Sequence, residues 1–236
     1  MGPLISFIIP TYNEENVIQQ TLEKVIVHIK QFDYEVIIAD DGSTDNTYPI
    51  IQSFAKKNKH IYGFSLSPNQ GRGAVLTAAL QKAKGKYAIY FDADLQLDLS
   101  LIEPVFSKLK EGADIAIVSK YHPSCKGNYS LFRSFFGRSY ACLARFVLGC
   151  PFSDFQGGFK GFNIQTILPI LGSVKQKKWN WDTEILAKSY WAGLHIEEVP
   201  GILNKSNKRQ SKVAVFHEIF IMANGLYEIW KDKKIK

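Results

Sequence analysis

The sequence predicts an α/β protein built on a doubly wound, mostly parallel central sheet. Short apolar runs rich in β-branched residues alternate with segments whose apolar residues recur every three to four positions. This alternation of strand and helix patterns is typical of a parallel sheet that helices cover on both faces. In addition, three acidic segments follow predicted strands directly, at the carboxyl ends where sheets of this kind bind ligands.

The first half of the chain is regular. Its predicted strands are bounded by Pro, Gly, Asn or Asp and cover residues 4–9, 35–39, 61–66, 87–91 and 114–119. The helices predicted between them cover residues 14–30, 45–58, 72–84 and 100–110. Glu103 and Pro104 suit the first turn of the last of these helices.

The second half is less regular. Its pattern predicts an arginine-bearing helix at 130–149 and a Gly- and aromatic-rich loop with a short strand at 153–163. A helix at 181–192, a strand at 196–200 and a mobile basic loop at 204–212 follow. We divide the chain into a main domain, 1–212, and a tail, 213–236. The tail is amphipathic and basic at its end, which fits a helix on an anionic membrane surface. A helix packed on the core with a frayed basic end fits equally well.

Basic residues gather in the second half of the chain, whose formal net charge is +7. Residues 119–160 carry six lysines and arginines against the single acid Asp154, and residues 201–236 carry eight against three acids. This distribution indicates an anionic partner, although a solvated basic face is the commoner cause of any one cluster. No nucleic-acid-binding motif accompanies the charge, so a nucleic-acid partner is not expected.

The composition fits a folded protein of the cytosol. Hydrophobic residues make up 46% of the chain, yet no run of 18 uncharged apolar residues occurs. The first residues enter a predicted strand with no basic leader before it. The three cysteines form no CxxC pair, which argues against disulfides and zinc.

The strand at 87–91 ends in a cluster of carboxylates, Asp92, Asp94 and Asp98. Such close carboxylates repel one another unless a positive charge lies among them. Asp92, Asp94 and the amide oxygen of Gln96 are hard oxygen ligands without His or Cys, which favours Mg²⁺ or Mn²⁺. We predict that these three residues hold a divalent ion, whose remaining ligands are the oxygens of a diphosphate.

Two further polar segments, PTYNEE (10–15) and DDGSTD (40–45), follow the first two predicted strands. Any one of these segments could be an ordinary turn, but three at one edge of a sheet indicate a shared crevice. The side chains expected around it, besides the carboxylates of the metal site, are Pro10, Tyr12, Glu14, Asp40 and Asp41.

Taken together, four motifs resemble the inverting glycosyltransferases of family 2, which have a GT-A fold: PTYNEE (10–15), ADDGSTDNT (39–47), NQGRGAV (69–75) and YFDADLQ (90–96). Four more resemble the dolichyl- and polyprenyl-phosphate mannosyl- and glucosyltransferases within that family: SDFQGGFKGF (153–162), WDTEIL (181–186), IEEVP (196–200) and RQSKV (209–213). The resemblance runs through the chain to about residue 213.

The resemblance implies a nucleoside diphosphate sugar as donor, either UDP-glucose or GDP-mannose, with glucose narrowly preferred. The donor-binding residues that it implies are Pro10, Tyr12, Glu14, Asp40, Asp41, Arg72, Asp92, Asp154, Arg209 and Lys212. Asp92 and Asp94 would act in catalysis, and the loop at Arg209 would close over the diphosphate. Asp154 would bind the sugar or orient an arginine, unless it caps its loop. Asp182 and Glu184 are expected to face the same site.

The acceptor implied by the resemblance is a polyprenyl or dolichyl phosphate at the cytoplasmic face of a membrane. A phosphate is already an anion at neutral pH, so it needs cations to hold it rather than a general base. Lys120, Arg133 and Arg138 are the expected phosphate ligands, and the two arginines are also expected to be catalytic. Members of this family often have Arg where this chain has Lys120, and a hydroxyl residue where it has Gly137. Lysine in place of arginine weakens the expected bidentate grip on the phosphate, but it keeps the positive charge.

Three alternatives remain beside this interpretation. A glycan or protein hydroxyl could be the acceptor, although the base motif of polysaccharide-forming relatives is not matched by Gln176-Lys177-Lys178-Trp179. A non-catalytic nucleotide-sugar or membrane-binding module is a second alternative. A phosphatase of the haloacid dehalogenase type is a third, but there the Asp-x-Asp motif follows the first strand rather than the fourth. A partner with transmembrane helices is compatible with each of them.

Overall fold

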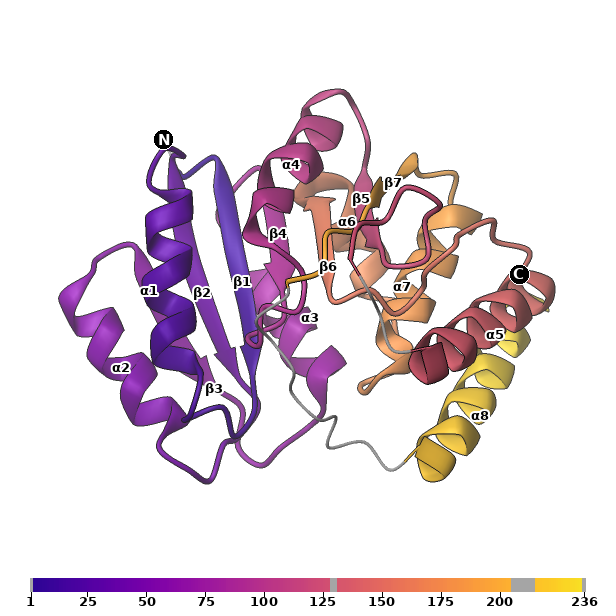
Figure 1. Ribbon diagram of the computed structural model, residues 1–236, viewed down its shortest axis with the longest axis horizontal. Coiled ribbons are helices and arrows are strands. Elements are labelled where there is room, and N and C mark those ends of the chain that lie inside the picture. The colour runs from indigo at the N-terminus through magenta and orange to yellow at the C-terminus, as the bar shows by residue number, and fades with distance from the viewer. Residues whose placement is uncertain (1, 128–130, 205–214, 235–236) are drawn as a thin grey trace.

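The computed structural model describes residues 2–127, 131–204 and 215–234 and contains one seven-stranded sheet (Figure 1). The strand order across the sheet is β3-β2-β1-β4-β6-β5-β7. In chain order the strands are β1 (Ile5–Thr11), β2 (Tyr34–Asp40), β3 (Ile61–Ser65), β4 (Tyr87–Phe91), β5 (Ile115–Ser119), β6 (Phe159–Asn163) and β7 (Ile196–Pro200). The five strands predicted in the first half, and those expected near 159–163 and 196–200, are therefore all present.

Helices cover both faces of the sheet (Figure 1). One layer consists of α1 (Ile18–Ile29), α2 (Thr47–Lys57) and α4 (Ile102–Lys110), with the 3₁₀ turn η1 (Leu99–Leu101) before α4. The other layer consists of α3 (Arg72–Lys82), α5 (Leu131–Leu148), α6 (Ile164–Leu171), α7 (Asn180–Trp191) and α8 (Val215–Lys234). Because β1, β4 and β5 pack between the two layers, all of their residues are buried, which explains the nearly continuous apolar runs there. The edge strands β3 and β7 are only partly buried.

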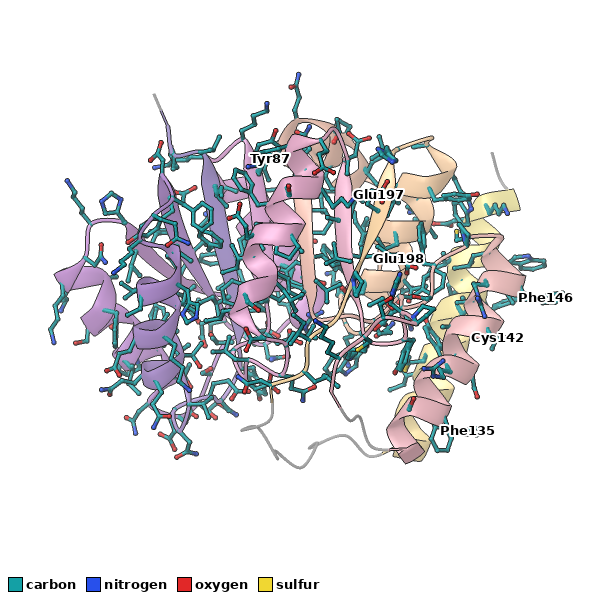
Figure 2. The ribbon with its side chains drawn as sticks, turned by 45° about the horizontal axis from the view of Figure 1, so that its top comes forward. Tyr87, Phe135, Cys142, Phe146, Glu197 and Glu198 are labelled. Atoms are coloured by element: carbon teal, nitrogen blue, oxygen red, sulfur yellow. The ribbon has the colours of Figure 1, made fainter. Side chains whose placement is uncertain are left out.

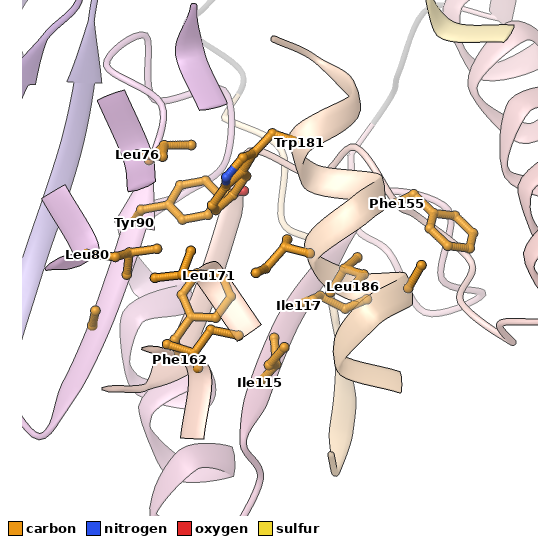
Figure 3. Close-up of a cluster of buried hydrophobic side chains, with 14 of the residues drawn as sticks. Leu76, Leu80, Tyr90, Ile115, Ile117, Phe155, Phe162, Leu171, Trp181 and Leu186 are labelled. Atoms are coloured by element: carbon orange, nitrogen blue, oxygen red, sulfur yellow. The ribbon is translucent and has the colours of Figure 1, made fainter. Parts of the chain in front are cut away.

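The larger core lies under the second helix layer, where Trp181 of α7 is fully buried (Figure 3). Its ring packs against Tyr90 of β4 with centroids 6.3 Å apart, and Tyr90 stacks on Phe162 of β6 at 5.9 Å. The indole Nε1 donates to Thr77 of α3 over 2.8 Å. Gly73 of α3 provides the space for this ring, since a Cβ there would lie 2.3 Å from the Cβ of Trp181.

The sheet direction confirms the predicted α/β class. β1 pairs in parallel with both β2 and β4, and of the described strands only β6 runs antiparallel to its neighbours, β4 and β5. The chain leaves β1 to one side for β2 and returns to its other side for β4. The carboxyl ends of β1 and β4 therefore flank the point where strand order reverses, which is where doubly wound sheets bind ligands.

One helix was not predicted from the sequence. α6 follows β6 directly, and the Asn163 side chain caps it by accepting a hydrogen bond of 3.2 Å from the backbone N–H of Gln165. Its sequence, IQTILPIL, spans only eight residues and contains Pro169, so it is too short for a clear helical pattern and carries a residue that usually interrupts helices.

The predicted C-terminal helix is present as α8, and it packs on the domain. Leu226 and Ile229 are buried in the core cluster, and the Asn180 side chain donates to the Ile221 carbonyl over 3.1 Å. The predicted boundary at residues 212 and 213 lies outside the described residues. Within the part of the chain that the structure describes, no helix combines the length and apolarity needed to cross a membrane.

Candidate active site

The loops after β1 and β2 are joined by side-chain hydrogen bonds. The backbone N–H of Asn13 donates to Ser43 Oγ over 2.9 Å, and the N–H of Thr44 donates to Asn13 Oδ1 over 2.9 Å. Asn13 adopts a left-handed backbone with φ of 53°, a conformation that Asn tolerates better than most residues. The joined loops leave Tyr12 exposed, while Pro10 is buried at the end of β1. Glu14 is half-buried beside them.

Asp40 is completely buried at the end of β2, and its carboxylate faces the scaffold. Its Oδ2 accepts hydrogen bonds from Ser65 Oγ over 2.6 Å and from the Ser43 N–H over 3.0 Å, while Oδ1 accepts from Ser43 Oγ over 2.5 Å. These contacts hold the turn after β2 and the end of β3 together. A carboxylate so occupied by the protein shapes the loops at this edge of the sheet and is not available to contact a ligand directly.

Asp41 shapes the turn that leads into α3. Its Oδ1 accepts from the backbone N–H of Gln70 over 2.8 Å, and its Oδ2 accepts from the N–H of Gly71 over 2.9 Å. Burial raises the pKa of Asp41 above its ordinary value, although these hydrogen bonds act in the opposite direction. Gly71 has a φ of 104°, which favours glycine. Asp41 thus fixes the residue before Arg72.

Arg72 begins α3 and joins two carboxylates from different parts of the sheet. Its Nη2 lies 2.8 Å from Asp92 Oδ1 at the end of β4, and its Nη1 lies 2.5 Å from Asp182 Oδ2 in the first turn of α7. The guanidinium also lies over the rings of Tyr90 and Trp179, at 5.3 and 5.8 Å from their centroids. Burial opposes its charge, but the attraction of the two carboxylates outweighs burial and raises the pKa of Arg72 well above its ordinary value.

Behind Arg72 lies a buried network in which Asp182 was expected from the sequence, whereas Lys160 and Tyr90 were not. Lys160 of β6 is fully buried, and its Nζ lies 2.7 Å from Asp182 Oδ1 and 3.0 Å from the Tyr90 hydroxyl. Tyr90 and Lys160 are cross-strand partners on β4 and β6, so their side chains share one face. The Tyr90 hydroxyl also donates to Asp182. A lysine between two phenylalanines in a buried strand was the available signal, because such a charge requires an anionic partner.

The pKa shifts of this network follow from its burial and pairing. Burial raises the pKa of Asp182, but Arg72 and Lys160 outweigh it and hold that pKa below its ordinary value. Burial lowers the pKa of Lys160, and the attraction of Asp182 offsets part of this effect. Burial and the Asp182 charge raise the pKa of Tyr90 well above its ordinary value. Asp182 is therefore the ionised centre on which Arg72 is positioned.

Glu184, two residues further along α7 and therefore on the other side of the helix, contacts neither Arg72 nor Lys160. Its Oε2 accepts from the backbone N–H groups of Lys175 and Gln176 over 2.9 and 2.6 Å, and its Oε1 lies 2.7 Å from Lys188 Nζ. It anchors the segment between α6 and α7.

The Asp-x-Asp loop after β4 presents carboxylate oxygens at the sheet edge. The Asp92 side chain is 41% exposed, and its backbone N–H donates to the Gly158 carbonyl over 3.0 Å. Gly158 leaves room for this carboxylate, since a Cβ there would lie 1.8 Å from Asp92 Oδ2 and would displace it. Asp94 Oδ2 accepts from the Gln96 Nε2 over 3.1 Å, and Leu95 between them has a φ of 48°.

The donor set of this loop fits a hard divalent cation that binds mainly to a substrate. Among the described residues no group of three His, Cys, Asp or Glu side chains gathers for a metal. Asp92 and Asp94 offer two carboxylates. One or two protein carboxylates are enough to bind Mg²⁺ when phosphate oxygens and water complete its coordination shell. Gln96 can add its amide oxygen.

A pocket at this edge brings Lys120 together with two of the three predicted metal ligands, Asp92 and Gln96, whereas Asp94 does not line it. Its lining includes Asp92, Gln96, Lys120 and Gly158, and the apolar residues Phe91, Leu95, Leu97 and Phe159 complete it. Lys120 directly follows β5, whereas Asp92 follows β4. The predicted acceptor lysine and the predicted donor carboxylate therefore line the same pocket although 28 positions separate them in the sequence.

Asp154 is buried and shapes the loop before β6. Its Oδ1 accepts from the Gln156 N–H over 2.9 Å, and its Oδ2 accepts from the Lys120 N–H over 3.2 Å. It therefore fixes the backbone of Lys120. The following Gly157 packs against the Val118 carbonyl, so the glycine pair lets two strand ends approach each other closely.

Arg138 lies on α5 close to the residue after Lys120. Its guanidinium is 5.5 Å from the ring centroid of Tyr121, and its Nε lies 3.3 Å from Ser134 Oγ. Gly137 accommodates the Tyr121 ring, since a Cβ at position 137 would lie 1.7 Å from the Tyr121 hydroxyl. The ring thus occupies the space where relatives were expected to carry a hydroxyl residue.

Three predicted residues cannot be placed. Arg209 and Lys212 lie outside the described residues, and the Arg133 side chain is likewise not described although its backbone belongs to α5. The described chain before 205 ends beside the Asp-x-Asp loop, where the Asn204 N–H donates to the Gln96 carbonyl over 2.9 Å.

The glycosyl transferase family 2 model matches residues 6–168, which include every strand end described above except that of β7. The chain belongs to glycosyltransferase family 2. It has the mostly parallel sheet and the C-terminal helix that the sequence predicted.

Two relatives match this family 2 chain over nearly its whole length. Glycosyltransferase AglD of Haloferax volcanii is 29% identical over 234 residues, which are 97% of this chain and 37% of AglD. The dolichyl-phosphate beta-glucosyltransferase of Dictyostelium discoideum is 27% identical over 242 residues, which are 95% of this chain and 73% of that protein. The chain thus spans only about a third of AglD.

A solved structure confirms the GT-A fold. Glucosyl-3-phosphoglycerate synthase from Mycobacterium tuberculosis, in complex with Mn²⁺, UDP and glucosyl-3-phosphoglycerate, superposes with a TM-score of 0.68 at 19% identity. The match covers 97% of this chain and 78% of that one.

Proposed function

We propose that this family 2 glycosyltransferase moves a hexose, glucose rather than mannose, from a nucleoside diphosphate sugar to a polyprenyl or dolichyl phosphate. The observation that carries the proposal is the pocket in which Lys120 lies with Asp92 and Gln96. A cation beside the metal-site carboxylates suits an acceptor that is itself an anion. The name of the Dictyostelium relative, a dolichyl-phosphate beta-glucosyltransferase, supports this acceptor and this sugar.

The donor would lie across the ends of β1, β2 and β4. Tyr12 is exposed there and can cover the nucleoside base, with Pro10 and Glu14 beside it. Asp40 and Asp41 shape the surrounding turns, and Arg72 approaches from the start of α3. Asp92, Asp94 and Gln96 would hold Mg²⁺ or Mn²⁺, which supplies charge neutralisation for the departing diphosphate. Arg209 and Lys212 are proposed to contact the same diphosphate.

The acceptor phosphate would lie on the other side of this pocket, held by Lys120 with Arg133 and Arg138 of α5. One of its anionic oxygens attacks the anomeric carbon with a lone pair. The bond from that carbon to the diphosphate oxygen breaks, its electrons leave with the diphosphate, and the configuration inverts. No proton has to be removed, so the acceptor side needs cations rather than a general base. The reaction is proposed to occur at the cytoplasmic face of a membrane.

The proposal is tested by transfer of radiolabel from UDP-glucose and from GDP-mannose, in parallel, to a short, water-soluble polyprenyl phosphate with Mg²⁺ or Mn²⁺. We expect organic-extractable label from UDP-glucose, lost on adding EDTA and in Asp94→Ala. Asp98→Ala is the matched control, because Asp98 caps η1 through the Ser100 N–H and lies in the same acidic segment. Label in a glycan or protein hydroxyl acceptor, with none in the lipid, would overturn the acceptor assignment.

A further inference from the structure

The outer face of α5 exposes a row of apolar side chains. Phe135 is 67% exposed and Phe146 is 88% exposed, and Cys142 between them is exposed as well. Figure 2 shows these three side chains along the side of α5 that points away from the sheet. Because an α-helix has about 3.6 residues per turn, positions 135, 142 and 146 lie on one line. Leu143, which is 47% exposed, flanks this line.

The opposite face of the same helix is the one that holds it on the protein. Ala141, Ala144 and Leu148 are buried in the core cluster. α5 therefore carries two apolar faces: one is covered by the protein, and the other is exposed in the described structure. The exposed Ser139 interrupts the row between Phe135 and Cys142, but exposed side chains as large as Phe135 and Phe146 on one helix face are typical of an interaction surface.

Basic residues flank the exposed row. By helical position, Arg138 and Arg145 lie on the side opposite to Leu143, and both are exposed. The sequence of α5, LFRSFFGRSYACLARFVL, contains three arginines and no acidic residue. An apolar face bordered by arginines, without acids, is the pattern of a helix that lies in the interface of an anionic bilayer.

The row is continuous with the proposed acceptor site. Arg138 lies over the ring of Tyr121, which is the residue after Lys120 in the pocket lining. A helix lying on the bilayer would therefore hold the pocket mouth near the lipid headgroups, where a polyprenyl phosphate carries its charge. This part of the inference rests on the proposed function, whereas the docking itself does not.

We propose that the outer face of α5, formed by Phe135, Cys142, Leu143 and Phe146 with Arg138 and Arg145, docks on an anionic lipid bilayer. A second copy of the chain fits this face less well. Two copies of α5 would bring arginines together with no acidic residue of that helix to pair with them. Anionic headgroups supply the missing negative charge, and the acyl region accepts the phenylalanines.

The first test is co-sedimentation of the whole chain with phosphatidylcholine vesicles, with and without phosphatidylserine. We expect binding that needs phosphatidylserine and falls at least about tenfold in Leu143→Gln/Phe146→Gln, since two apolar side chains lose their burial. Arg145→Gln should weaken binding about fivefold. Val27→Gln is the matched control, because Val27 is a 62% exposed apolar residue on α1.

The second test uses Cys142 as a reporter and needs no variant. Vesicles with phosphatidylserine should slow its alkylation by a water-soluble maleimide, while leaving the alkylation of Cys125 unchanged. Unchanged vesicle binding in the double variant, or an apolar-face variant that only dissociates a dimer in lipid-free solution, would overturn the inference. Transfer to the short soluble polyprenyl phosphate should persist in the double variant, so failure of docking and failure of the proposed reaction give different results.

Discussion

Lys160 and Asp182 form a fully buried ion pair of 2.7 Å between β6 and α7, and the other oxygen of Asp182 holds Arg72. One carboxylate thus compensates two cations, Lys160 in the core and Arg72 at the carboxyl edge of the sheet. The chain positions Arg72 by a charge that solvent does not reach.

Removal of the Asp182 charge should therefore cost more than removal of the Lys160 charge. Asp182→Asn leaves Lys160 buried without an anion, so we expect a loss of about 3–5 kcal/mol in the free energy of unfolding. Lys160→Met leaves Asp182 paired with Arg72 and should cost less. The double variant should lose less than the sum of the two, with a coupling above about 1 kcal/mol in urea unfolding.

The exposed pair of Lys175 and Asp232, 2.9 Å apart, is the control for this cycle. Because solvent screens it, Lys175→Met should have no measurable effect on the unfolding transition. Additive losses in the Lys160 and Asp182 cycle would show that the two residues do not act as a pair.

Asp40 and Asp94 should respond differently to the same substitution. Asp40 is buried and accepts from Ser43 and Ser65, so Asp40→Asn should lower the free energy of unfolding by at least about 2 kcal/mol. Asp94→Asn should leave it within about 0.5 kcal/mol while abolishing sugar transfer. Urea unfolding and the transfer assay on both variants check this, and equal stability of the two variants would contradict a scaffold role for Asp40.

Gly73→Ala should destabilise the protein although alanine is the better helix former. In an open helix position the change would stabilise by about 1 kcal/mol. Here the new Cβ would lie 2.3 Å from the Cβ of fully buried Trp181, so we expect a net loss of about 1–3 kcal/mol. The thermal midpoint measures it, with tryptophan fluorescence reporting the displaced ring. A raised midpoint would mean that Trp181 has room to move.

Stability should fall at alkaline pH through Cys150. Burial raises the pKa of this thiol from 9.0 to about 11, so the folded chain keeps the proton where the unfolded chain has lost it. The contribution of Cys150 is fully present below pH 9.0 and is lost as the pH rises toward about 11. Over that window the free energy of unfolding should fall by about 2–3 kcal/mol more than in Cys150→Ala. Parallel curves for the two proteins would contradict this assignment.

The sheet and its ligand-binding edge could be predicted because their signals are local. Each strand is a short apolar run, and the Asp92 and Asp94 carboxylates follow such a run directly. The family motifs added Arg72, and the basic region at 119–160 added Lys120; the structure places both at the same edge. These predictions needed no knowledge of long-range contacts.

The remaining features depend on contacts that the sequence pattern does not encode. Asp40 and Asp92 look alike in sequence, yet one faces Ser65 inside the scaffold and the other faces the pocket. In the sequence, Lys160 belongs to a basic region, but in the structure its ammonium group forms an ion pair with Asp182 in the core. The amphipathic pattern of the tail predicted a membrane-surface helix at α8. Among the described residues, however, α5 exposes more large apolar side chains than α8 does.

The antiparallel strand β6 lies between β4 and β5, although the chain reaches it only after both. The first 127 residues alone would therefore contain β5 with neither of its neighbours, since β6 and β7 both come later. Two unpaired edges would be open to association with other chains. We therefore expect that the first 127 residues do not form a stable module alone, and that a gene split between β5 and β6 yields fragments that fold only by complementing each other.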